Sequence, residues 1–127
     1  MNDKIYFNEK DNQELVKLYE LKKFSDAKKK ANEILSDYPE AYVVHNILGA
    51  ILSTENKLDK AITHYKKAIK IKPDYAEAYN NLGTAIQKTH NLDEAILNYK
   101  SALKNKPKFA EAHNNLGAAL HKLGNFN

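Results

Sequence analysis

The 127-residue sequence contains no cysteine, no tryptophan and no arginine, and it has only three prolines and four glycines. Without cysteine, the chain can form no disulfide, no thiolate metal site and no cysteine nucleophile. All 20 basic residues are lysine, which binds phosphate as a point charge, whereas bidentate recognition of bases usually falls to arginine. Because the net charge of +4 comes from lysine without arginine, we expect no nucleic-acid partner.

Membrane-spanning and catalytic signals are missing as well. No apolar run approaches the ~20 residues that cross a bilayer, so we expect no membrane insertion. The first seven residues lack the basic start and the long apolar stretch of a signal peptide, which favours a cytoplasmic protein.

The sequence also offers no recognisable reaction chemistry. No serine or threonine lies in a nucleophile elbow, and the glycines form no phosphate loop. His113 and His121 are eight residues apart with no third ligand. We expect no metal, no cofactor and no enzymatic activity.

What the sequence does contain is a period of 34 residues. Prolines, glycines and alanines recur in phase, at Pro39, Pro73 and Pro107, at Gly49, Gly83 and Gly117, and at Ala27, Ala61 and Ala95. Between segments 42–75 and 76–109, 13 of 34 aligned positions are identical. A fixed period of this length predicts a stacked repeat architecture.

Each repeat has the pattern of two helices joined by a short turn. In segment 76–109, the apolar residues Ala78, Leu82 and Ile86 recur at helical spacing, and a second apolar face follows the break at His90. Asp93 and, one repeat earlier, Asp59 are predicted to cap the second helices. Proline ends the unit because it disfavours helix at the preceding residue.

The mid-helix glycines predict close helix packing. Glycine inside a helix costs roughly 1 kcal/mol relative to alanine, which a fold accepts where a neighbouring helix approaches closely. We expect the recurring alanines, such as Ala61 and Ala95, on the facing helix. His45 and His113 also lie at packing positions, so we expect both to be at least half-buried.

This pattern resembles the tetratricopeptide repeat (TPR), whose form is an aromatic, Leu-Gly, an aromatic, Ala, an aromatic and Pro at set spacings. The chain carries it as Tyr79, Leu82-Gly83, Ile86, Ala95, Tyr99 and Pro107. The resemblance implies an all-α fold, a right-handed α-solenoid of antiparallel helix pairs with about three and a half repeats and seven helices. We expect one domain, 1–127, with a degenerate repeat at 8–41, repeats at 42–75 and 76–109, and a first helix at 110–127.

The resemblance also implies that the first helices of the repeats line a concave groove that binds a protein partner, as an extended peptide or a partner helix. The predicted groove residues are Asn46, Asn80, Asn81, Thr84, Lys88, Asn114, Asn115 and Lys122. A ladder of amides could pair with the backbone of an extended peptide, since an amide carries both donors and an acceptor. The alternative is that these asparagines are tolerated polar residues or bond locally between repeats.

The C-terminal segment carries apolar residues without a partner helix in the sequence. Leu116, Leu120, Leu123 and Phe126 are predicted to be available for self-association. Three functions therefore remain open. The first is a non-catalytic protein-interaction module, the second is the recognition arm of a larger transferase whose catalytic part follows residue 127, and the third is a self-assembling scaffold.

Overall fold

The computed structural model describes residues 8–124, and these residues form seven helices and no strand. In chain order, the helices are α1 (Glu9–Glu20), α2 (Phe24–Asp37), α3 (Tyr42–Thr54), α4 (Leu58–Ile71), α5 (Ala76–Lys88), α6 (Leu92–Asn105) and α7 (Ala110–Gly124). Phe126, which the sequence predicted for self-association, lies outside the described residues.

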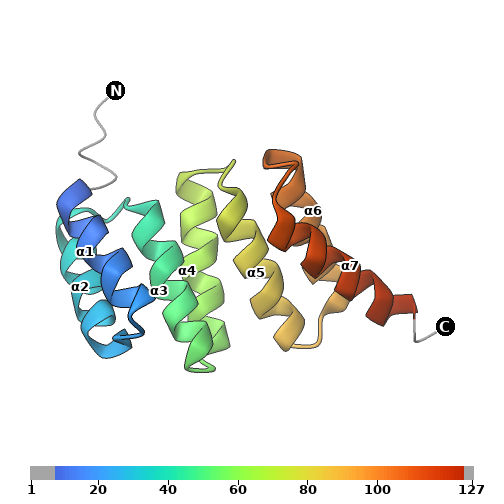
Figure 1. The fold of residues 1–127 in the computed structure, drawn as a ribbon, viewed down its shortest axis with the longest axis horizontal. Coiled ribbons are helices and arrows are strands. Elements are labelled where there is room, and N and C mark those ends of the chain that lie inside the picture. The colour runs from blue at the N-terminus through green and yellow to red at the C-terminus, as the bar shows by residue number, and fades with distance from the viewer. Residues whose placement is uncertain (1–7, 125–127) are drawn as a thin grey trace.

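The helices stack in two layers along the length of the molecule (Figure 1). Helices α1, α3, α5 and α7 contact one another in series, and α2, α4 and α6 pack behind them, each against the helices before and after it. We call the surface made by α1, α3, α5 and α7 the first-helix face and the opposite surface the second-helix face. The prediction of an all-α helical solenoid is confirmed. No described helix is long and apolar enough to cross a membrane.

In every helix pair, the chain turns and the second helix ends at the same positions of the 34-residue repeat. Each of α2, α4 and α6 ends two residues before a proline. Within each pair, the turn contains one residue with a left-handed backbone, at Lys22, Asn56 and His90, where φ is 59°, 60° and 68°. Single left-handed residues of this kind commonly stop a helix and let the chain reverse. The 34-residue period is therefore a period of turns as well as of packing.

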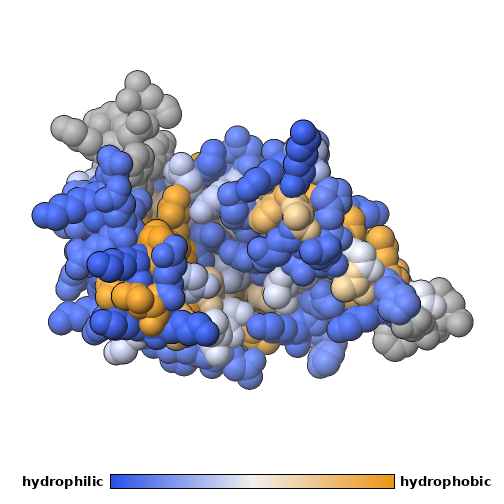
Figure 2. All heavy atoms as spheres, in the orientation of Figure 1, coloured by the Kyte–Doolittle hydropathy of each residue, from blue (hydrophilic) through white to orange (hydrophobic). Residues whose placement is uncertain are grey.

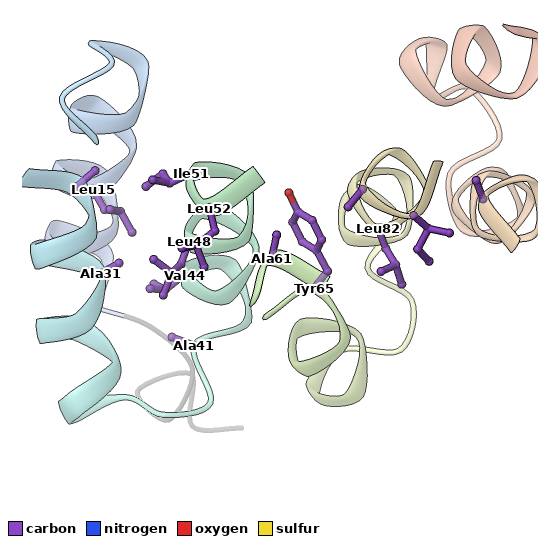
Figure 3. Close-up of a cluster of buried hydrophobic side chains, with 14 of the residues drawn as sticks. Leu15, Ala31, Ala41, Val44, Leu48, Ile51, Leu52, Ala61, Tyr65 and Leu82 are labelled. Atoms are coloured by element: carbon purple, nitrogen blue, oxygen red, sulfur yellow. The ribbon is translucent and has the colours of Figure 1, made fainter. Parts of the chain in front are cut away.

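A continuous hydrophobic core runs between the layers (Figure 3). Tyr65 of α4 belongs to the same cluster as Leu48 of α3 and Leu82 of α5, so the cluster extends across two consecutive repeats. Burial of each such side chain contributes about 1.5–3 kcal/mol. Because each helix pair shares its core with the next, the repeats stabilise one another.

The prediction of close packing at the glycines holds at two positions and is wrong at the third. A Cβ on Gly83 would lie 2.7 Å from the Tyr99 ring and 3.1 Å from the Ala95 carbonyl oxygen. Gly49 faces Tyr65 in the same way, at 2.6 Å. A Cβ on Gly117 would have no side chain and no other helix of the described chain within 4 Å, because no described helix packs over this side of α7.

Two further expectations are corrected by the structure. Asp59 and Asp93 do not cap α4 and α6. Each helix begins at the leucine before the aspartate, which places both acids in the first turn. His113 is exposed rather than half-buried, for the same reason that Gly117 has no neighbour. His45 is buried, at 6% exposure, as expected.

The last helix leaves part of its apolar side open. Leu116 packs against the core, whereas Leu120 and Leu123 are 45% and 37% exposed. Figure 2 shows hydrophobic residues gathered along this end of the molecule and, at the other end, over α1 and α3. Both patches interrupt a surface that is otherwise mostly polar.

Candidate functional site on the first-helix face

The asparagines predicted for the groove bond to one another between repeats. The Asn81 amide nitrogen donates to Asn46 Oδ1 at 3.0 Å, and Asn115 donates to Asn80 Oδ1 at 2.9 Å. Each bond joins residues 35 apart in the sequence, so it links α3 to α5 or α5 to α7. The asparagines therefore form a ladder of hydrogen bonds between side chains of the protein itself.

Asn80 and Asn46 are buried, and Asn80 is only 1% exposed. Asn80 also donates from its amide to Glu111 Oε1 at 3.1 Å. A buried amide whose oxygen and nitrogen are both paired has little to offer a ligand, since buried polar groups are satisfied internally. These two residues hold the repeats in register, and Asn114, at the same phase in α7, is exposed.

Half of the predicted groove residues come together around one pocket between α5 and α7. Its volume is about 420 Å³. The residues that line it are Thr84, Gln87, Lys88, His90, Tyr99, Asn115, Ala118 and Lys122. We call this the α5–α7 pocket. Its lining includes two lysines and no aspartate or glutamate, so its electrostatics favour an anionic group.

Tyr99 orients two other residues that line the α5–α7 pocket. Its hydroxyl donates to Gln87 Oε1 at 2.8 Å and approaches Thr84 Oγ1 at 3.4 Å. Burial raises the pKa of Tyr99, so the phenol stays neutral at physiological pH. Because the Gln87 amide oxygen accepts from Tyr99, the amide nitrogen of Gln87 is the group that can donate to other partners.

A second pocket lies at the other end of the same face, between α1 and α3. Its volume is about 480 Å³, and it is lined by Glu9, Asn12, Gln13, Val16, Lys17, Glu20, Tyr42 and Val43. We call this the α1–α3 pocket. The apolar side chains of Val16 and Val43 and the Tyr42 ring suit a hydrophobic side chain. The sequence reasoning missed this site because the first repeat is degenerate and its groove positions do not match the motif.

The sequence reasoning also missed a pair of histidines. His45 in α3 and His64 in α4 are 19 residues apart, yet their Nδ1 atoms lie 3.1 Å from each other. No helical spacing in the sequence links the two residues. The sequence offered one signal, which is that both residues lie on the facing sides of the two helices predicted for one repeat.

The chain is similar to known proteins in both sequence and fold. A sequence model described as the TPR repeat matches residues 49–89 and 91–124. No curated protein sequence matches the chain. Among solved structures, the Sgt2 TPR domain from Aspergillus fumigatus superposes with a TM-score of 0.85 at 18% identity, covering 94% of this chain and 83% of that one.

Two further solved structures show the same fold. The first TPR of Spaghetti (RPAP3), bound to the HSP90 peptide SRMEEVD, gives a TM-score of 0.82 at 21% identity and covers 88% of this chain and 89% of that one. MamA gives 0.78 at 24% identity, with 84% and 63% covered. At these identities, the likeness establishes the helical architecture.

Proposed function

This chain belongs to the TPR repeat family, and we propose that it is a non-catalytic protein-interaction module whose first-helix face binds an extended acidic peptide. The observation that carries the proposal is the α5–α7 pocket. Thr84, Lys88, Asn115 and Lys122 all line it, and these are four of the positions that the repeat pattern marks for ligand contact. Two ammonium groups and neutral donors suit a carboxylate side chain.

The spacing of the two pockets supports an extended ligand. The α1–α3 and α5–α7 pockets are separated by about two helix spacings, each of roughly 8–10 Å. An extended chain covers about 3.3–3.6 Å per residue, so five or six residues bridge the pockets. A peptide with an apolar residue at one end and acidic residues at the other matches both linings.

A solved relative provides a probe of this kind. The RPAP3 domain is bound to a peptide of sequence SRMEEVD, which combines methionine and valine with three acids. We would measure fluorescence anisotropy with an array of labelled acidic heptapeptides that includes SRMEEVD, and with the same peptides carrying lysine in place of glutamate. The proposal expects the acidic set to bind and the lysine set to bind weakly or not at all.

The decisive variant is Lys88→Glu combined with Lys122→Glu. Reversing both charges in the α5–α7 pocket should abolish binding of the acidic peptides. The matched control is Lys66→Glu with Lys100→Glu, which reverses two exposed charges on α4 and α6, the helices of the second layer. Equal loss in both variants would indicate that only net charge matters, and unchanged affinity in the first would refute the proposed site.

A second candidate function has its own observation. Leu120 and Leu123 are exposed on α7, where a further helix would continue the stack. Stacking of two copies through this end would bury both leucines, each worth about 1.5–3 kcal/mol. This scaffold function is tested by the concentration dependence of the molecular mass, described below.

A further inference from the structure

Asn12 of α1 occupies the same position of the repeat as Asn46 of α3 and Asn80 of α5, because the three residues are 34 apart. Asn46 and Asn80 are buried, and the amide oxygen of each accepts from the asparagine 35 residues later. The amide oxygen of Asn12 is also buried, but it has no hydrogen-bond partner among the described residues. The acceptor that the later repeats satisfy internally is therefore left over in the first repeat.

The sequence of the second repeat explains why this partner is missing. The residue 35 positions after Asn12 is Ile47. At the equivalent position, the later repeats have the donors Asn81 and Asn115. Ile47 packs against the hydrophobic core, and its side chain has no N–H or O–H to donate. The first hydrogen bond of the asparagine ladder is therefore absent.

A partner of the amide nitrogen is replaced in the same way. Asn80 donates to Glu111 Oε1 at 3.1 Å, and Glu111 lies 31 residues later. The residue 31 positions after Asn12 is Val43, whose side chain accepts no hydrogen bond. The second repeat thus has apolar side chains at two positions where the partners of Asn80 are polar.

Asn12 lines the α1–α3 pocket together with Val16 and Val43. Asn12 is half-buried and its terminal torsion is soft, so a rotation of the side chain turns the amide oxygen toward the pocket. The charged residues of the lining are two glutamates and one lysine, a balance that disfavours an acidic side chain. Figure 2 shows hydrophobic residues gathered over the same two helices. The pocket therefore suits an apolar side chain with a hydrogen-bond donor next to it.

We propose that the Asn12 amide oxygen accepts a hydrogen bond from the backbone N–H of a peptide residue whose apolar side chain fills the α1–α3 pocket. This contact rests on the peptide-binding function proposed above and adds a second point of recognition to it. Main-chain hydrogen bonds hold an extended peptide whatever its sequence, and side-chain pockets select among peptides. Asn12 therefore fixes the position of the ligand backbone, and the pocket selects an apolar residue.

The buried state of the acceptor favours this bond. A buried acceptor without a partner carries its desolvation cost in the free protein. A ligand that donates to Asn12 removes this cost and does not have to strip water from the oxygen. An exposed asparagine, such as Asn114 at the same position of α7, exchanges one hydrogen bond with water for one with the ligand. Asn12 should therefore contribute more to binding than Asn114.

The test uses two small uncharged probes and nuclear magnetic resonance of the ¹⁵N-labelled full chain. The first probe is N-acetyl-leucine methylamide, and the second is the same molecule methylated at the leucine nitrogen, which removes that N–H. We expect the first probe to shift the amide signals of Val16 and Val43. The second probe should bind roughly 2–10-fold more weakly, the range expected for the loss of one hydrogen bond.

Variants of Asn12 assign the difference between the probes to its oxygen. In Asn12→Leu, which has no acceptor, the two probes should bind equally. In Asn12→Asp, which keeps an acceptor oxygen, the preference for the unmethylated probe should remain. The matched control is Asn114→Leu, which should bind both probes as the wild type does.

Ile47→Asn gives an independent test, because it restores the donor that the later repeats have. The new amide should donate to the Asn12 oxygen, so the preference for the unmethylated probe should disappear although Asn12 is still present. Circular dichroism verifies that each variant is folded.

Stability separates a ligand-binding role of Asn12 from a structural one. Asn12→Leu removes an acceptor without a partner, so it should unfold at the same urea concentration as the wild type or at a higher one. Asn80→Leu breaks hydrogen bonds to Glu111 and Asn115, so it should unfold at a lower concentration. A comparable loss in both variants would mean that Asn12 serves the fold.

Three results would overturn the proposal. They are the absence of shifts around the α1–α3 pocket, equal binding of the two probes by the wild type, and an unchanged preference in folded Asn12→Leu. Failure of the proposed function is seen separately, because acidic peptides that ignore the reversal of Lys88 and Lys122 would refute the α5–α7 pocket. The uncharged probes do not depend on those lysines.

Discussion

At the scale of single residues, two tyrosines set the distance between the helices of a pair. Tyr65 and Tyr99 are buried and their rings lie against Gly49 and Gly83, where a Cβ would come within 2.6–2.8 Å of ring carbons. The glycine and the tyrosine therefore specify one another. Each also lies at a fixed phase of the repeat, so the contact recurs every 34 residues.

Gly83 and Gly117 occupy the same position of consecutive repeats, so substituting each of them gives a matched pair of tests. Gly83→Ala should destabilise the protein by roughly 1–3 kcal/mol, because the new methyl lies against the buried Tyr99 ring and the Ala95 carbonyl. Gly117→Ala should stabilise it by up to about 1 kcal/mol, since alanine is the better helix former and meets no side chain and no other helix of the described chain. Urea unfolding measures both, and equal effects would contradict this packing.

The residue scale also shows how far the site could be read from the sequence. Thr84, Lys88, Asn115 and Lys122 were predicted for the groove because the resemblance to the TPR family implies that the first helices line it, and all four line the α5–α7 pocket. The burial of Asn80 was not predictable, because it depends on Glu111 and Asn115, which belong to the next repeat. The α1–α3 pocket was missed since the first repeat departs from the motif.

An ion pair between repeats gives a pH dependence. Glu55, in the turn after α3, accepts from Lys28 of α2 at 2.7 Å. This hydrogen bond lowers the pKa of Glu55 below its ordinary value of 4.5. A lowered carboxyl pKa contributes stability above the unfolded-state value, and that contribution is lost as the pH falls through the folded-state value.

Glu55→Gln isolates this contribution. Wild type should be more stable than the variant above pH 4.5, and the difference should shrink as the pH is lowered further. The effect should be small because the pair is partly exposed and screened by salt. Thermal unfolding of both proteins from pH 3 to 7 measures it, and a difference that grows toward acid pH would contradict the assignment.

At the scale of elements, helix existence was predicted correctly but helix starts were not. The apolar spacing of 76–109 fixed two helices, and α5 and α6 fill that segment. Asp93 looked like a cap because it precedes the apolar face, yet Asn91 occupies the cap position. The choice between neighbouring polar residues depends on backbone angles that the sequence pattern does not specify.

The cap of α6 can be tested directly. Asn91 accepts from the backbone nitrogen of Glu94 at 3.2 Å. Replacing it with alanine should cost about 0.5–2 kcal/mol. Asp93→Asn should cost less, about 0.3–1 kcal/mol, because it removes only a favourable charge near the helix N-terminus. If chemical denaturation ranked the two variants in the opposite order, Asp93 would be the true cap.

At the scale of the whole molecule, the solenoid presents two surfaces and one open end. The first-helix face carries the two pockets, the other layer brings His64 beside His45, and α7 exposes leucines. A stack of repeats can extend as long as each new pair covers the last. The open side of α7 is therefore the position at which this stack would continue.

Self-association through α7 predicts a specific mutational pattern. Light scattering over a concentration series should show a mass that rises in wild type and stays monomeric in Leu120→Lys with Leu123→Lys. Leu97→Lys is the matched control, because Leu97 is 63% exposed but lies on α6, a helix of the second layer, and not on α7. A wild-type chain that is monomeric at the highest concentration would rule out the scaffold function.

Ligand binding to the first-helix face can be observed residue by residue with nuclear magnetic resonance. An acidic peptide identified on the array would be titrated into ¹⁵N-labelled protein. We expect the largest amide shifts around the α5–α7 pocket, at Thr84, Lys88 and Asn115, with further shifts near Val16. Shifts confined to α2, α4 and α6 would contradict binding at the first-helix face, since the ligand would then lie on the second-helix face.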